Sequence, residues 1–171
     1  MSDISPFVIS ISDEQIIDLN DRIANTRWPD AETTGDWNQG VPLAYVKELV
    51  QYWAGRYDQQ RLAHRLNAFD NFKTNLLGLN IHFMHIKSSN PRARPLLLTH
   101  GWPGSVVEFL KVITPLTEPQ EHGGKADDAF HLVIPSLPGY GFSDKPQTTG
   151  WGVEKIAEAW ASLMARLGYN R

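Results

Sequence analysis

The 171-residue sequence contains no cysteine, so it can form neither a disulfide framework nor a thiolate metal site. It has no apolar run near the roughly 18 residues that span a bilayer, and its acidic start, Met1-Ser2-Asp3, is unlike a signal peptide. Its 16 Lys and Arg and 19 Asp and Glu are interspersed, giving a net charge of −3, which argues against a nucleic-acid or anionic-membrane surface. We therefore expect a soluble, cytoplasmic protein with no membrane anchor and no nucleic-acid partner.

The first seventy residues are predicted to be helices and loops. Ser12 and Gln15 form a capping box before a helix that continues to Ile23, and a second helix begins at Pro42 and carries apolar residues to Tyr57. A third, shorter helix is predicted over 58–67. The apolar stripes of these helices are too short to close a core between themselves. We therefore expect them to pack against a sheet.

The hydrophobic period changes after residue 70 and becomes typical of strands. Strands are predicted over 72–77 and 79–86 around Gly78, then over 96–99 and 130–134. A helix over 104–114 is expected to end at Pro115, a polar loop covers 118–128, and an amphipathic helix ends before Gly168. A hairpin followed by strand–loop–helix repeats predicts an α/β fold with a mostly parallel sheet that starts antiparallel.

Two turns rich in Gly and Pro follow two successive buried strands. The first contains His100-Gly101-Trp102-Pro103 and the second spans 138–144, and both are expected at one edge of the sheet, where open α/β folds bind ligands. The Trp102 N–H of the first turn has no ladder partner and is free to face a developing oxyanion. A tight turn that only reverses the chain remains the alternative. The second turn has G-x-G without the third glycine of a dinucleotide site.

The six histidines do not have the spacing of a metal site. His82 and His85 lie three apart on a predicted strand and therefore on opposite faces. No metal or cofactor is expected. His100 is predicted to brace its turn, and the other histidines are predicted to be structural: His64, His82, His85, His122 and His131.

Several motifs together resemble the N-terminal portion of an epoxide hydrolase of the microsomal and juvenile-hormone type. They occur in order over nearly the whole chain and are more specific together than any one alone. They are Thr26-Arg27-Trp28-Pro29-Asp30, the segment 53–57, Leu66-Asn67 with Phe72-Lys73, His100-Gly101-Trp102-Pro103-Gly104-Ser105 with Glu108-Phe109, Gly139-Tyr140-Gly141-Phe142-Ser143, and the segment from Gly150-Trp151 to Tyr169.

The resemblance implies the N-terminal part of an α/β-hydrolase sheet, an incomplete fold preceded by a mainly helical region. Residues 1–90 would form the epoxide hydrolase N-terminal region with the first hairpin, and residues 91–171 would begin the α/β-hydrolase domain. It further implies that Trp102 donates its backbone N–H to an oxyanion hole, that His100, Gly101 and Pro103 shape the turn, and that Trp102 and Phe109 contact substrate.

The implied reaction adds water to an epoxide through an ester of a nucleophilic Asp, with cap tyrosines assisting the ring oxygen and a His activating water. The resemblance places that Asp directly after the last helix, beyond Arg171, so the chain is expected to be inactive alone. Its expected partners are a small-molecule epoxide and the C-terminal part of the same protein. Without that part, the strand over 96–99 would be an open, uncharged apolar edge that invites association.

Two alternatives remain open. One is a non-catalytic remnant that acts as an interaction module, and nothing in the sequence separates it from the enzyme. The other is an ester or haloalkane hydrolase of the same fold, and the helical preface favours an epoxide hydrolase over it.

Overall fold

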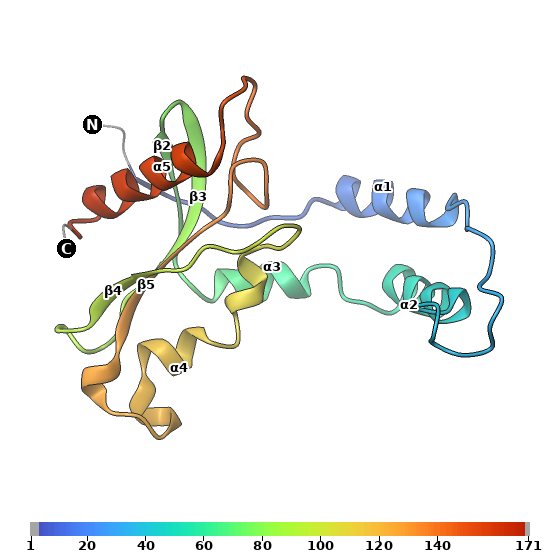
Figure 1. Cartoon of the computed structure of the whole chain (residues 1–171), viewed down its shortest axis with the longest axis horizontal. Coiled ribbons are helices and arrows are strands. Elements are labelled where there is room, and N and C mark those ends of the chain that lie inside the picture. The colour runs from blue at the N-terminus through green and yellow to red at the C-terminus, as the bar shows by residue number, and fades with distance from the viewer. Residues whose placement is uncertain (1–3, 170–171) are drawn as a thin grey trace. The chain divides into compact units, whose positions relative to one another are not determined.

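The computed structural model describes residues 4–169. Contacts divide the chain into two compact units, one formed by Ser10–His64 and the other by Met1–Ile9 together with Arg65–Arg171. The sheet lies in the second unit (Figure 1). The predicted division at residue 90 separates sequence regions and not compact units, and it stays a prediction. No helix within residues 4–169 is long and apolar enough to cross a membrane.

Helices α1 (Asp13–Ala24) and α2 (Leu43–Gly55) belong to the first unit. The capping box is confirmed, because the Gln15 N–H donates to Ser12 Oγ at 3.3 Å and the Ser12 N–H donates to Gln15 Oε1 at 2.9 Å. Pro42 is the N-cap residue of α2 and not its first helical residue. Helix α3 (Arg61–Asn67) begins three residues later than predicted.

The first unit does not bury the apolar faces of α1 and α2. All residues of both helices are described, and none of them is buried. The two helices line an open apolar groove of about 710 Å³. Their packing against the sheet therefore stays a prediction. The groove is lined by Ile11, Gln15, Ile16, Leu19, Leu49, Val50, Tyr52, Trp53, Tyr57, Gln59 and Leu62.

The second unit contains a five-stranded mixed sheet in the order β1-β2-β3-β5-β4. The antiparallel start is confirmed, and β5 continues it by pairing antiparallel with β3. Among the described strands, parallel pairing is limited to β4 and β5, so the expectation of a mostly parallel sheet is wrong for this part of the chain. The strands are β1 (Ser5–Pro6), β2 (Asn71–Leu76), β3 (Leu79–Ile86), β4 (Arg94–Leu97) and β5 (Phe130–Pro135).

A two-residue turn joins β2 to β3. Leu77 and Gly78 both have positive φ, 49° and 90°, as a type I′ hairpin turn requires. The turn sets the register in which Leu76 pairs with Leu79. That register puts Ile81 and Phe83 of β3 on one face of the sheet, because successive side chains alternate.

Helix α5 (Val153–Arg166) covers this face (Figure 1). Its Ala159, Trp160 and Leu163 are buried in one cluster with Ile81 and Phe83. The helix ends before Gly168, as predicted, and the φ of 87° at Gly168 allows a Schellman motif. In that motif the Tyr169 N–H donates to the Met164 carbonyl at 2.9 Å, and the Gly168 N–H donates to the Ala165 carbonyl at 3.0 Å.

Strand β4 begins two residues before the predicted strand over 96–99 and ends at Leu97. It follows the parallel ladder to β5, in which Arg94 pairs with Phe130. The Arg94 N–H donates to the Ala129 carbonyl, just before β5, and the Leu98 N–H donates to Val133 of β5. The N side of Pro95, between them, therefore faces away from that strand. A proline is tolerated there because no ladder bond is lost. Because the strand contains Arg94, the expectation of an uncharged edge is wrong.

The predicted helix over 104–114 is wrong. The segment forms a 3₁₀ turn, η1 (Val106–Phe109), followed by α4 (Ile113–Thr117). Pro115 lies inside α4 instead of ending it, because it is the third residue of the helix, where a backbone N–H would have no intrahelical acceptor. The predicted polar loop contains two further 3₁₀ turns, η2 (Pro119–His122) and η3 (Ala126–Asp128).

His82 and His85 lie on opposite faces of β3, as predicted. His82 contacts Ser136, whereas His85 Nε2 lies 2.9 Å from the Tyr169 hydroxyl. Burial, and then the positive charge of Lys73, lower the pKa of His82 to about 4. Burial, and then Lys87, lower the pKa of His85 to about 4. Both imidazoles are therefore neutral at neutral pH.

We predict that the free energy of unfolding falls as the pH is lowered from about 6.5 to 4. In this window the unfolded chain binds protons at both histidines and the folded chain does not, so acid favours unfolding. The fully buried His82 should contribute a slope on the order of 1 kcal/mol per pH unit. Urea unfolding at several pH values, followed by tryptophan fluorescence, measures it.

His85→Gln should make this dependence shallower, because one of the two groups no longer titrates. The matched control is His122→Gln, which changes an exposed histidine and should leave the slope unchanged. An equal slope in His85→Gln and the wild type would contradict the prediction.

Candidate active site

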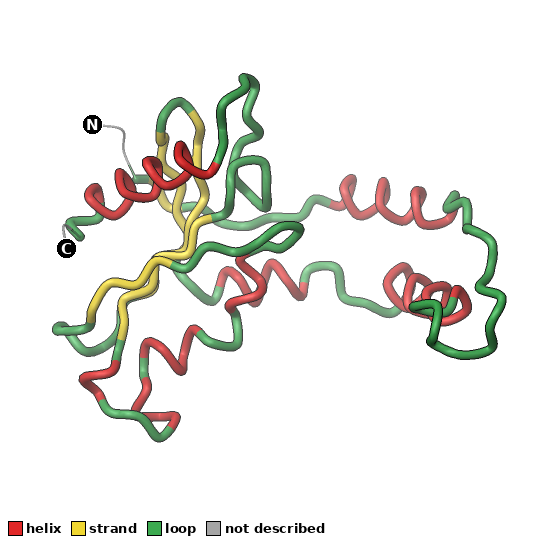
Figure 2. Tube along the Cα trace, viewed as in Figure 1, coloured by secondary structure: helices red, strands yellow, loops and turns green. Residues whose placement is uncertain are grey.

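The two predicted turns leave the same edge of the sheet. Strands β4 and β5 run parallel, so their carboxyl ends coincide, and the loops that follow them start there (Figure 2). The loop after β4 contains the residues from His100 to Pro103, and the loop after β5 contains the G-Y-G-F-S motif. The structure therefore brings together the two motifs that the sequence places about forty residues apart.

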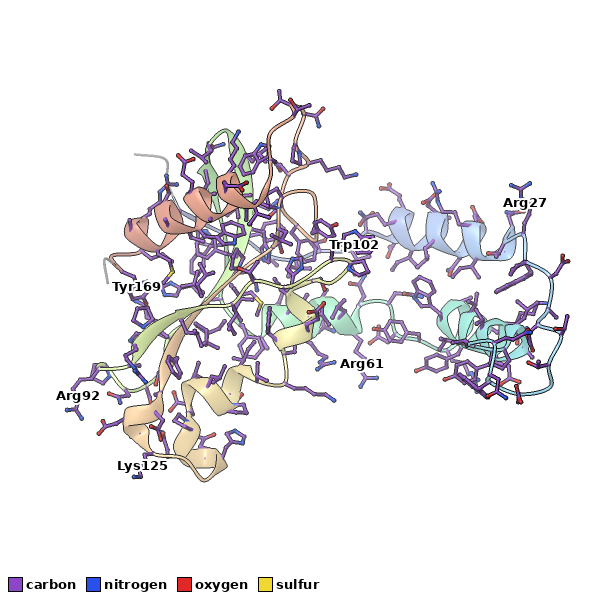
Figure 3. The ribbon with its side chains drawn as sticks, in the orientation of Figure 1. Arg27, Arg61, Arg92, Trp102, Lys125 and Tyr169 are labelled. Atoms are coloured by element: carbon purple, nitrogen blue, oxygen red, sulfur yellow. The ribbon has the colours of Figure 1, made fainter. Side chains whose placement is uncertain are left out.

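The first loop makes a tight turn around Trp102. The Gly104 N–H donates to the Gly101 carbonyl at 2.8 Å, and the Trp102–Pro103 peptide bond is cis. The Trp102 side chain projects from this loop and is 81% exposed (Figure 3). Within residues 4–169 the Trp102 N–H makes no hydrogen bond. A backbone donor at the end of a strand is thus available to a ligand.

His100 connects the two loops. Its Nε2 accepts a hydrogen bond from the Leu137 N–H at 3.1 Å, so its proton is on Nδ1, which donates to the Gly101 carbonyl at 3.0 Å. The ring is 3% exposed and lies edge-on to Tyr140, with 5.7 Å between centroids. Because both nitrogens are occupied by backbone groups, the contacts of His100 are those of a residue that braces the turn.

Gly104 and Phe109 lie beyond the turn. A Cβ at Gly104 would collide with the Glu108 carboxylate and come within 3.0 Å of the Gly101 carbonyl, so the turn is closed tightly here. Phe109 is the last residue of η1 and is half-buried. Its contact with substrate stays a prediction, as do the roles predicted for His100, Gly101, Trp102 and Pro103.

The second loop is fastened to the edge of β3. The Asp144 N–H donates to the Asn80 carbonyl at 2.9 Å, and Asp144 Oδ2 accepts from the Asn80 side chain at 2.8 Å. Ser143 Oγ accepts from the His82 N–H at 3.0 Å. Gly141 has a φ of 51° and approaches Ser136 closely, because a Cβ on it would lie 2.8 Å from Ser136 Oγ. The loop is therefore held along its length.

A buried polar cluster that the sequence does not reveal lies under these loops. Only a structural role is predicted for His82, and none for Asn71 or Ser136, yet each of the three is at most 5% exposed and hydrogen bonded. The available signal was the alternation in β3, where His82 lies opposite the apolar face. No group of three His, Cys, Asp or Glu side chains suited to a metal occurs in the described residues.

We predict that Gly141→Ala destabilises the protein more than Gly123→Ala. Both positions have positive φ, which costs an alanine roughly 1–2 kcal/mol. Only Gly141 also meets Ser136, which adds about 1–2 kcal/mol of overpacking, whereas Gly123 faces open space. Urea unfolding of the two variants measures the difference in stability. Equal losses of stability would contradict the prediction and would mean that the loop moves away from Ser136 without cost.

Comparison with known proteins agrees with the motifs. A family model described as the epoxide hydrolase N terminus matches residues 4–109, and one described as the alpha/beta hydrolase fold matches residues 94–171. A putative epoxide hydrolase of Stigmatella aurantiaca is 57% identical over 98% of this chain and 38% of its own length. Epoxide hydrolase 1 of Sus scrofa is 38% identical with the same coverage of both chains.

Two solved structures of epoxide hydrolases match all or nearly all of the chain. Juvenile hormone epoxide hydrolase of the silkworm Bombyx mori has a TM-score of 0.87 at 37% identity and covers 100% of this chain and 41% of its own. The Aspergillus niger epoxide hydrolase has a TM-score of 0.83 at 33% identity, and the match covers 97% of this chain and 43% of the Aspergillus chain. The chain thus spans about two fifths of the length of these relatives. The resemblance and the α/β-hydrolase fold are confirmed, and the chain belongs to the epoxide hydrolase family.

Proposed function

We propose that this chain is the N-terminal portion of an enzyme that adds water to an epoxide to give a vicinal diol. The observation that carries the proposal is the unpaired Trp102 N–H in the loop that follows β4, where His100 is hydrogen bonded to the Gly101 carbonyl and the Leu137 N–H. The match to the epoxide hydrolase N terminus favours this reaction over ester or haloalkane hydrolysis on the same fold.

The proposed reaction has two steps. A carboxylate oxygen of an Asp attacks an epoxide carbon, the carbon–oxygen bond of the ring breaks, and the released alkoxide takes a proton from a tyrosine hydroxyl. Water, deprotonated by a histidine, then attacks the carbonyl of the resulting ester. The tetrahedral intermediate bears an oxyanion and collapses, and the departing alkoxide takes the proton from the histidinium to give the diol. The proton of the released carboxylic acid returns to the tyrosinate, which regenerates the Asp carboxylate. The Trp102 N–H stabilises that oxyanion, so it acts in the second step.

In this proposal the nucleophilic Asp, the histidine and the tyrosines of the cap lie outside residues 1–171. The relatives extend well beyond the matched region, which supports this assignment. The chain then acts with the remainder of the same protein on a small-molecule epoxide, and we propose a cytoplasmic location.

We predict that purified residues 1–171 do not hydrolyse styrene oxide, because the covalent step lacks its carboxylate. The full-length enzyme should produce the diol. In a single turnover in ¹⁸O-water its diol should be unlabelled, since the added oxygen comes from the Asp. Turnover by residues 1–171 of verified intact mass would contradict the proposal, and a full-length protein without turnover would favour a non-catalytic interaction module.

We predict that Trp102→Phe in the full-length enzyme leaves kcat within about threefold, because the backbone N–H remains. The value of KM should rise only if the indole contacts substrate, so steady-state kinetics separates the two roles predicted for Trp102. A drop in the turnover rate by about two orders of magnitude, in a protein that is folded by circular dichroism, would assign the donor to the indole instead.

A further inference from the structure

A buried chain of hydrogen bonds runs from β2 to the turn around Trp102. It begins at Asn71, whose Nδ2 donates to the Leu66 carbonyl at 2.9 Å and to the Phe69 carbonyl at 2.8 Å. With its amide nitrogen committed to these carbonyls, the Asn71 side chain presents Oδ1 to His82, whose Nε2 lies 3.0 Å away. An amide oxygen only accepts, so His82 carries its proton on Nε2.

This tautomer determines the orientation of Ser136. His82 Nδ1 bears a lone pair and lies 2.8 Å from Ser136 Oγ, so the serine hydroxyl donates to it. The backbones of the two residues are also joined, because the Ser136 N–H donates to the His82 carbonyl at 2.9 Å. The Ser136 carbonyl in turn accepts from Ser143 Oγ at 2.8 Å. Ser136 is therefore fixed by its side chain, its N–H and its carbonyl.

Ser136 directly precedes Leu137, whose N–H donates to His100 Nε2 at 3.1 Å. The position of Ser136 therefore determines the direction of the Leu137 N–H. Within residues 4–169, this N–H makes the only hydrogen bond from the loop after β5 to the His100 ring. His100 passes the constraint to the Gly101 carbonyl, the group that closes the turn on Gly104. The Trp102 N–H lies between these two glycines.

We propose that His82, as the neutral Nε2–H tautomer, is a positioning residue of the oxyanion turn, acting through Ser136, Leu137 and His100 on the Trp102 N–H. This role rests on the proposed function. His82 is suited to it because its ring is fully buried, and Phe7 and Phe142 both lie edge-on to it, with 5.6 Å and 5.2 Å between ring centroids. Burial lowers the pKa of the ring to about 4, so the neutral form persists at working pH.

The direct test is ¹⁵N NMR of the histidine rings and of the Leu137 and Trp102 amides. The wild-type protein should have the proton on Nε2 of His82 and on Nδ1 of His100. A coupling across the hydrogen bond should join the Leu137 amide nitrogen to His100 Nε2. The opposite tautomer at either ring, or the absence of this coupling, overturns the proposal without any variant.

Ser136→Ala removes the hydroxyl that His82 orients and leaves the His100 ring intact. It should shift the His100 ring nitrogens and the Trp102 amide. The matched control is Thr117→Val, which removes another buried hydroxyl, bonded to the Ile113 carbonyl at 3.1 Å, and should leave these signals in place. Unchanged His100 and Trp102 signals in folded Ser136→Ala overturn the proposal.

In the full-length enzyme, Ser136→Ala should lower kcat roughly tenfold with KM within about twofold, because a displaced donor weakens transition-state binding and not substrate binding. Thr117→Val should keep both constants within about twofold. A wild-type enzyme that has the expected spectra but no epoxide turnover contradicts the proposed function alone. An active enzyme whose Ser136→Ala variant keeps its kcat contradicts the positioning role alone.

Discussion

Strand β5 bonds antiparallel to β3 on one side and parallel to β4 on the other. This double pairing determines which segments can meet at the site. The parallel side brings the ends of β4 and β5 together, and with them the loops that contain Trp102 and the G-Y-G-F-S motif. The antiparallel side places the first half of β3 beside the loop that leaves β5, so that Asn80 and His82 hold it. A site built from segments about sixty residues apart depends on these two ladders.

The elements predicted well are those whose signals are local. The capping box before α1, the turn between β2 and β3 and the glycine after α5 each specify a boundary through neighbouring residues. Strand β1 has no comparable signal, because two residues are ordered only by pairing with β2. The predicted start of β4 is two residues too late for the same reason. The strand begins where it can pair with the first residue of β5, and not where its own apolar run begins. The prediction that Pro115 ends a helix is wrong because a proline breaks a helix only from an interior position, and Pro115 lies in the first turn of α4.

The candidate site likewise has one part with a local sequence signal and one part without it. The turn from His100 to Pro103 and the glycines of the second loop are visible in the sequence as breaks after apolar runs. The cluster beneath them is not, because Asn71 lies in β2, His82 in β3 and Ser136 directly after β5, and no spacing relates them. Burial is the property that makes them informative: a histidine with no exposed surface must have partners for both nitrogens, which only the folded chain reveals.

Pro95 makes the two halves of β4 differ in their ability to pair with another strand on the side away from β5. The first half of the strand contains Arg94, which is charged, and Pro95, which has no amide donor. Both residues discourage pairing with another strand. Leu97, in the second half, keeps its N–H and carbonyl on the side away from β5. A strand that paired there could bond to Leu97, at the end of β4 nearer the turn around Trp102, and would find no backbone donor at Pro95. The outer side of β4 thus offers its backbone donor at the end that leads into the turn around Trp102.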